Sequence, residues 1–247
     1  MQENELENQI TDTGANATPI KKEPKKLVLA ILGSIASVLI FAPLIFIIIS
    51  MGIFLNTHQA FGVGGESMMP TFQGNEIVYV RNQAPKRGDT VVIFAKHLEN
   101  RPDIVDPYML KRVVAVAGDT VDIVNNAGDY RLMRNGHDIT LCYIDAEYLI
   151  TLPGITMQTI MRSHFFYFEF YKAQNPTRVG EGGVLILSGE VFVLGDNRTN
   201  SHDSSDFGPI PINGTDFKVI GVVRHIIPGG TSQFKHYFMR FWFAAQF

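Results

Sequence analysis

Residues 108–125, YMLKRVVAVAGDTVDIVN, contain two runs of β-branched and aromatic residues separated by Gly118-Asp119. Two such runs around a glycine-containing turn are typical of antiparallel strands. Similar short runs, bounded by turn residues, occur at 76–81, 90–95, 184–187, 191–194 and 219–227. We therefore expect a mostly β domain of antiparallel coiled or barrel-like sheets, with no long amphipathic helix between residues 60 and 230.

An apolar segment precedes this β region. Residues 27–55 include no charged side chain, and about 20 apolar residues suffice to cross a bilayer core. The apolar part of a cleaved signal peptide is shorter, about 7–15 residues, so we expect an uncleaved transmembrane anchor. Lysines cluster just before the segment, at Lys21, Lys22, Lys25 and Lys26. This cluster predicts a single-pass protein of the cell (inner) membrane, with a cytoplasmic N-terminus and residues 56–247 outside.

The predicted organisation has four parts. Residues 1–26 form a polar, disordered cytoplasmic tail, 27–55 the anchor, 56–230 the β-rich domain, and 231–247 an aromatic and basic C-terminal segment. An excursion at about 126–183 interrupts the β-rich domain. Its aromatic cluster, 164–171, fits either a hairpin packed on the main sheet or a surface that faces a membrane or a partner.

The C-terminal segment has a helical pattern. Aromatic residues recur there at helical spacing, and basic residues fall on the other side; the aromatic set is Phe234, Tyr237, Phe238, Phe241 and Trp242. A basic helix with an aromatic face suits a membrane interface. A helix docked on the β domain is the equal alternative.

Composition excludes several classes of function. Charged residues make up 18% of the chain, below the roughly 25% of soluble domains, which agrees with a membrane segment. The net charge of −3 provides no basic excess for nucleic acid. The single cysteine, Cys142, excludes an internal disulfide and a cysteine-rich zinc site, and its apolar neighbours indicate a packing residue.

Ser67 is the candidate nucleophile, because it lies in a glycine- and proline-rich turn, GGESMMP. A serine nucleophile needs a base. The seven histidines are scattered, no G-x-S-x-G elbow occurs, and His202 and Asp203, as neighbours on an extended chain, point to opposite faces. A Ser–His–Asp triad is therefore weakly supported. Lys111 lies in an apolar strand, where burial would lower its pKa from about 10.4 and make it a base.

Three stretches occur in order behind the anchor: 65–72 (GESMMPTF), 111–119 (KRVVAVAGD) and 195–204 (GDNRTNSHDS). Together they resemble the signature motifs of type I signal (leader) peptidases, which are membrane-bound serine endopeptidases with a Ser–Lys pair. Residues 85–92, PKRGDTVV, resemble a further family stretch. The resemblance covers the anchor and most of 60–125 and 184–225, but not the excursion.

The resemblance implies the catalytic roles. Ser67 attacks the peptide carbonyl, and uncharged Lys111 takes its proton and later passes it to the leaving amine. Ser201 orients the lysine. Some members use a serine hydroxyl in the oxyanion hole where this chain has Gly65, so backbone N–H groups, chiefly that of Ser67, are expected to hold the oxyanion.

The resemblance also implies supporting roles. Arg112 pairs with Asp196 and fixes the strand of Lys111, while Met68 helps to shape the substrate cleft. Asp203 belongs to the same support, but Ser205 stands where the family commonly has an arginine that pairs with this carboxylate. Arg198 is the candidate substitute.

We therefore expect a membrane-bound endopeptidase that removes N-terminal signal peptides from exported precursors through an acyl-enzyme, preferring small residues before the cut. Its partners are these precursors and the lipid bilayer. We expect no cofactor, and the acidic residues of 195–206 do not match the EF-hand calcium loop. The alternatives are a dedicated peptidase for one pilin- or conjugation-type substrate and an inactive membrane scaffold.

Overall fold

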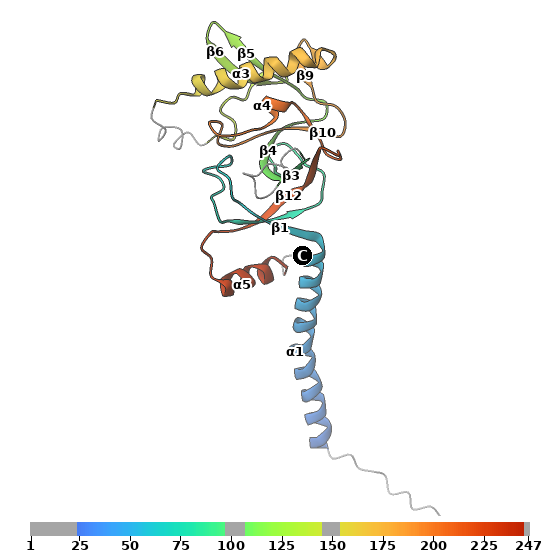
Figure 1. Ribbon diagram of the computed structural model, residues 1–247. Helices are drawn as coiled ribbons and strands as arrows, with labels where there is room; N and C mark the ends of the chain where they lie inside the picture. The colour runs from blue at the N-terminus through green and yellow to red at the C-terminus, as the bar shows by residue number, and fades with distance from the viewer. Residues whose placement is uncertain (1–23, 97–106, 145–153, 245–247) are drawn as a thin grey trace, which may run out of the picture. The chain divides into compact units, whose positions relative to one another are not determined.

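The computed structural model describes residues 24–96, 107–144 and 154–244 (Figure 1). The tail expected at 1–26 lies outside these residues up to position 23. The chain divides into two compact units, Met1–Ile49 and Ser50–Phe247.

Helix α1, Pro24–Thr57, contains the predicted anchor. Apolar side chains are exposed along its length, as at Leu29 and Leu39, which are 72% and 70% exposed. A helix that is apolar on all sides and unburied suits a bilayer rather than a protein core. Among the described residues, Lys25–Thr57 is the one stretch long and apolar enough to cross a membrane.

The second unit contains two antiparallel sheets, which confirms the expected mostly β fold. The larger sheet has the order β1-β2-β12-β3-β4-β10-β11, and the smaller one β7-β6-β5-β9-β8. The larger comprises β1 (His58–Gly62), β2 (Ile77–Arg81), β3 (Thr90–Ala95), β4 (Tyr108–Val116), β10 (Glu190–Leu194), β11 (Ile210–Pro211) and β12 (Phe217–Ile227). The smaller comprises β5 (Thr120–Asn126), β6 (Asp129–Arg134), β7 (His137–Asp138), β8 (Val179–Gly180) and β9 (Gly183–Leu185). Both sheets are open, not closed barrels.

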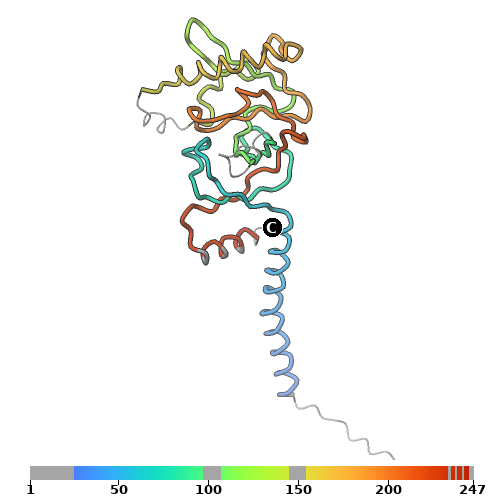
Figure 2. Tube along the Cα trace, in the orientation of Figure 1, coloured from blue at the N-terminus to red at the C-terminus, as the bar shows by residue number. Residues whose placement is uncertain are grey.

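A tight turn connects the two sheets. Gly118 adopts φ 88° between β4 and β5, a left-handed conformation that glycine adopts without strain. The Asp119 carboxylate stabilises this turn, because it accepts the Val116 N–H at 2.9 Å and pairs with Arg87. Figure 2 shows the chain returning late in the sequence to the larger sheet, where β12 lies between β2 and β3.

The expectation that residues 60–230 lack a long amphipathic helix is wrong. Helix α3, Met157–Gln174, occupies part of the excursion, for which a hairpin was one of the two interpretations. Its N-cap is Thr156, whose side-chain oxygen accepts the Thr159 N–H. Aromatic residues on its outer side, Phe166, Tyr167 and Phe170, are more than half exposed, so they obscure the helical spacing of the buried ones. The buried face of α3 comprises Ile160, Met161, His164, Phe168 and Tyr171.

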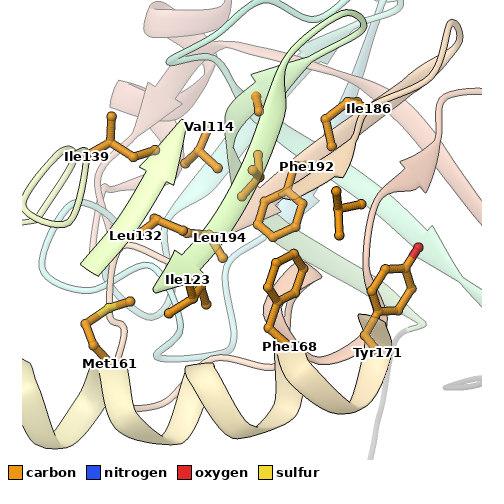
Figure 3. Close-up of a cluster of buried hydrophobic side chains, with 13 residues drawn as sticks. Val114, Ile123, Leu132, Ile139, Met161, Phe168, Tyr171, Ile186, Phe192 and Leu194 are labelled. Carbon is orange, nitrogen blue, oxygen red and sulfur yellow. The ribbon is translucent and has the colours of Figure 1, made fainter. Parts of the chain in front are cut away.

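Helix α3 packs on the smaller sheet and on the back of β4 and β10. Figure 3 shows Met161, Phe168 and Tyr171 projecting from α3 into the cluster that includes Ile123, Leu132 and Phe192. The phenyl rings of Phe168 and Phe192 meet edge to face, with centroids 5.6 Å apart. This core holds α3 against the segment that follows β10. The segment includes the one-turn helix α4, Ser204–Phe207. A short 3-10 helix, η2 (Pro176–Arg178), follows α3 in the chain.

The predicted C-terminal helix is present as α5, Gln233–Ala244. It packs against the rest of the second unit through Met239, Phe243 and Ala244, in a cluster with Phe54, Tyr79 and Ile227. Phe54 belongs to the last turns of α1, which lie within the second unit. Phe238 and Trp242 of α5 remain 55% and 56% exposed.

Candidate active site

Strand β4 carries two adjacent basic residues, Lys111 and Arg112, whose side chains bond to different partners. Adjacent side chains of a strand point to opposite faces. Lys111 is buried, 3% exposed, and its Nζ lies 2.7 Å from the Oγ of Ser67. Arg112 instead donates from Nε and Nη2 to the two carboxylate oxygens of Asp196, at 2.7 and 2.5 Å, and from Nη1 to the Gly88 carbonyl at 2.8 Å. This two-pronged ion pair ties β4 to the loop after β10.

Ser67 is held in its turn by the same loop. The Asn197 N–H donates to the Ser67 carbonyl at 3.0 Å, and the Asn197 amide donates to the Glu66 carbonyl at 3.1 Å. Gly195 permits this approach, since a Cβ there would lie 2.5 Å from the Ser67 carbonyl oxygen and 2.3 Å from the Ser201 Oγ. Only glycine fits such a contact.

Burial lowers the pKa of Lys111 to about 8, although the charges of Asp203, Asp206 and Asp196 act in the opposite direction. Desolvation penalises the ammonium form. A lysine with this pKa supplies an uncharged amine in mildly alkaline solution. Hydrogen-bonded to a serine hydroxyl, that amine can remove the hydroxyl proton as the serine attacks a carbonyl.

The backbone around Ser67 offers a donor for an oxyanion. Among the described residues, the Ser67 N–H donates to no protein acceptor. Gly65, two positions earlier, is exposed and has nothing within 4 Å of where a Cβ would stand. Met68 points elsewhere: it is 1% exposed, in a cluster with Val63 and Phe72.

Ser201 is brought to the site, but its hydrogen bond goes to Asp203 Oδ2, at 2.5 Å, rather than to Lys111. Asp203 is fully buried and also accepts the Gly195 N–H at 2.9 Å. Burial opposes its ionisation, but the nearby His164 and Lys111 charges and these hydrogen bonds outweigh it, so the pKa of Asp203 is lowered.

Arg198, the candidate substitute for an arginine at position 205, bonds elsewhere. It is buried and donates to the carbonyls of Gly195 and Cys142, at 3.0 and 3.1 Å. Its side chain makes no hydrogen bond to Asp203. Cys142 itself is exposed, so the expectation that it packs in the core is wrong.

The partner on the other side of Asp203 is Ser205, which donates from its N–H and its hydroxyl to Oδ1, at 3.1 and 2.9 Å. Ser205 in turn contacts His164 of α3 at 2.5 Å. Sequence reasoning missed His164, which stood among seven scattered histidines. Its spacing from Met161, Phe168 and Tyr171 along one helical face was the available signal.

Two further arrangements can be assessed. His202 is exposed and contacts Asp206 at 3.1 Å, so its imidazole is directed to that carboxylate and not to Ser67. In the part of the chain that the structure describes, no three histidine, cysteine, aspartate or glutamate side chains converge as a metal site requires.

The sequence is similar to proteins of one family. The chain matches the family model "Signal peptidase, peptidase S26" over residues 34–227. It is 28% identical to signal peptidase I of Aquifex aeolicus over 202 residues, which cover 68% of this chain and 77% of the relative. Identity to signal peptidase I of Leptolyngbya laminosa is 25% over 171 residues, 67% of this chain and 68% of the relative. A crystal structure of a signal peptidase I from Enterococcus faecalis V583 aligns with a TM-score of 0.37 and 22% identity, over 57% of this chain and 98% of that one.

Proposed function

Because this chain belongs to the signal peptidase family, peptidase S26, we propose that it cleaves signal peptides from exported precursors with Ser67 as nucleophile and Lys111 as general base. The observation that carries the proposal is the 2.7 Å contact between Lys111 Nζ and Ser67 Oγ in a buried setting. A serine beside a lysine of lowered pKa is a sufficient nucleophile–base pair. The enzyme is a serine endopeptidase.

Acylation comes first. Uncharged Lys111 takes the Ser67 proton as Oγ attacks the scissile carbonyl, and the Ser67 N–H donates to the resulting oxyanion. The Lys111 ammonium then gives its proton to the leaving amine. The C–N bond breaks, the mature protein departs, and the signal peptide remains as an ester on Ser67. Lys111, uncharged again, next activates a water molecule that hydrolyses this ester and restores Ser67.

The residues around this pair position it. The Ser201 hydroxyl gives its hydrogen to Asp203, so its oxygen lone pairs are available to accept from the Lys111 ammonium. The Arg112–Asp196 pair holds β4 against the loop that contacts Ser67. Met68 is buried with Val63 and Phe72, so it would shape the substrate cleft only by supporting the Ser67 turn from the core. Gly65 is exposed and adds no side chain near this turn. Small residues before the cut are the preference that the family resemblance implies.

The membrane arrangement is a further part of the proposal. Helix α1 spans the bilayer once, with Lys25 and Lys26 at its cytoplasmic end and the second unit outside. Helix α5 then lies at the outer interface. Its inner side packs on Phe54, near the end of α1, and its exposed Phe238 and Trp242 suit the interfacial zone, where aromatic rings accumulate.

The test uses the full chain with a precursor bearing an Ala-x-Ala site, beside Ser67→Ala and Lys111→Ala. Cleavage by the wild type and its loss in both folded variants support the proposal. Equal processing by all three would contradict it. An inactive scaffold predicts cleavage by none, and a dedicated peptidase predicts cleavage of only one precursor in a panel.

A further inference from the structure

Helix α3 inserts a histidine into the hydrogen-bond network behind the active site. His164 is 7% exposed, and both of its ring nitrogens have partners. Nε2 lies 2.9 Å from the Arg198 carbonyl oxygen, and Nδ1 lies 2.5 Å from the Ser205 Oγ. Since a carbonyl oxygen only accepts, Nε2 must be the donor in the first contact.

The second contact begins a continuous path to the catalytic pair. The Ser205 hydroxyl donates to Asp203 Oδ1, and Oδ2 of the same carboxylate accepts from the Ser201 hydroxyl and the Gly195 N–H. Gly195 lies directly against the Ser67 carbonyl and the Ser201 side chain. Hydrogen bonds through Ser205 and Asp203 thus connect His164 of the excursion helix with Ser201 and Gly195 beside Ser67.

This hydrogen-bond path matters because it passes through the buried carboxylate of Asp203. Asp203 has no exposed surface, so its charge depends on the donors around it. Ser205 has one hydroxyl hydrogen, which serves either Asp203 Oδ1 or His164 Nδ1. Because Nε2 already carries a hydrogen, Nδ1 donates to the Ser205 oxygen only in the doubly protonated ring; in the singly protonated ring it accepts from Ser205 and withdraws that hydrogen from Asp203. In either state, loss of the His164 contact frees the Ser205 hydroxyl to rotate and changes how the carboxylate holds Ser201 and acts on Lys111.

We propose that His164 is a positioning residue for signal-peptide cleavage, acting through Ser205 and Asp203 on the Ser67–Lys111 pair. The proposal rests on the proposed function, because it assumes that Ser67 and Lys111 perform the reaction. Under this proposal α3 does more than pack on the sheets, because it supplies the histidine at the far end of the hydrogen-bond network of the active site.

The rival explanation is that His164 only fixes α3 to the loop. In that case its contact with the Arg198 carbonyl, which lies off the path to Asp203, matters as much as the contact with Ser205. Two conservative substitutions separate the contacts. Asparagine places an amide nitrogen near the position of Nδ1, whereas glutamine places one near the position of Nε2. Thus His164→Asn retains the Ser205 contact, and His164→Gln retains the Arg198 contact.

The experiment measures kcat, KM and thermal unfolding of the full chain in detergent, using a peptide that spans an Ala-x-Ala cut site. We expect His164→Gln to lower kcat on the order of tenfold with little change in KM, the loss expected for one misplaced hydrogen bond to a charged group. His164→Asn should keep kcat within about threefold. Met161→Ala, one turn earlier on the same buried face, controls for weakened α3 packing: it should lower the unfolding temperature and leave kcat unchanged.

A double-mutant cycle gives an independent check. Ser205→Ala removes the middle of the path, so adding His164→Gln to it should cost no further kcat. Equal kcat for the asparagine and glutamine variants, or independent effects of His164→Gln and Ser205→Ala, would overturn the proposal. Ser67→Ala is measured in the same experiment and separates failure of the proposed function from failure of the His164 proposal. If Ser67→Ala cleaves like the wild type, the Ser67 assignment itself fails. If Ser67→Ala is inactive, the comparison of the two His164 variants tests the role of His164 alone.

Discussion

Lys111 Nζ lies 2.7 Å from Ser67 Oγ, joining a buried strand to a turn 44 positions earlier in the chain. Burial desolvates the lysine, while the Asn197 N–H donates to the Ser67 carbonyl and Gly195 lies against the same carbonyl. The proposed chemistry at this contact requires an uncharged amine. A permanent cation of similar length at position 111 is therefore expected to abolish it.

The substitution Lys111→Arg follows from this. A guanidinium stays protonated in proteins and cannot act as a base. We expect cleavage to fall by about 10²–10⁴-fold, the usual contribution of a general base. Initial rates on an Ala-x-Ala precursor measure the loss. Lys96→Arg is the matched control, because Lys96 is 59% exposed and pairs loosely with Asp216. Substantial cleavage by Lys111→Arg would exclude Lys111 as the base.

Gly195→Ala tests the close approach between the loop after β10 and the nucleophile. Its Cβ would stand 2.5 Å from the Ser67 carbonyl oxygen, so the loop must move away from Ser67. We expect a loss of about 1–3 kcal/mol in the free energy of unfolding, as for overpacked sites, together with lost activity. Gly74→Ala, where an added Cβ meets nothing within 4 Å, should leave both unchanged. Identical behaviour of the two variants would argue against the packing described for Gly195.

Removing one partner of the Arg112–Asp196 ion pair should strongly destabilise the fold. The pair's side chains are 15% and 2% exposed, and removing one partner leaves a poorly solvated charge. For Asp196→Ala we expect a destabilisation of about 3–5 kcal/mol, measured by denaturant unfolding in detergent. Asp216→Ala breaks an exposed pair and should change stability by less than about 0.5 kcal/mol. Similar losses of stability in both variants would show that breaking the buried pair costs no more than breaking the exposed one.

Trp242 reports directly on the membrane contact of α5, because it is the chain's single tryptophan. Its side chain is 56% exposed on the helix surface. In liposomes we expect its fluorescence to be quenched by lipids brominated near the headgroup and protected from the aqueous quencher acrylamide. Strong quenching by acrylamide without quenching by brominated lipid would place α5 in water and leave only α1 at the membrane.

Particular residues show how far the sequence could predict this molecule. Runs of β-branched and aromatic residues at 90–95 and 108–117 predicted β3 and β4 nearly to the residue. The motifs around Ser67 and Lys111 predicted that these two side chains form a pair, and the structure brings them into contact. The pairing of β12 between β2 and β3 is a long-range outcome that local patterns do not contain.

The excursion resisted prediction for a physical reason. Helix α3 has large aromatic side chains on both its buried and its exposed sides, so its hydrophobic pattern has no clear period. His164 was therefore not recognised as part of the buried face. The resemblance marked Ser205 as a departure from the family pattern, but the residue that contacts it, His164, comes from outside the motifs that carry the resemblance.

The most direct test of the central claim is the pH dependence of kcat/KM, which reports the ionisation of essential groups in the free enzyme. Burial lowers the pKa of Lys111 to about 8, and the uncharged form is the reactive one, so kcat/KM should rise with pH through an apparent pKa near that value. An ascending limb that titrates instead near about 10.4, the value of a solvated lysine, would contradict a buried Lys111 as the base.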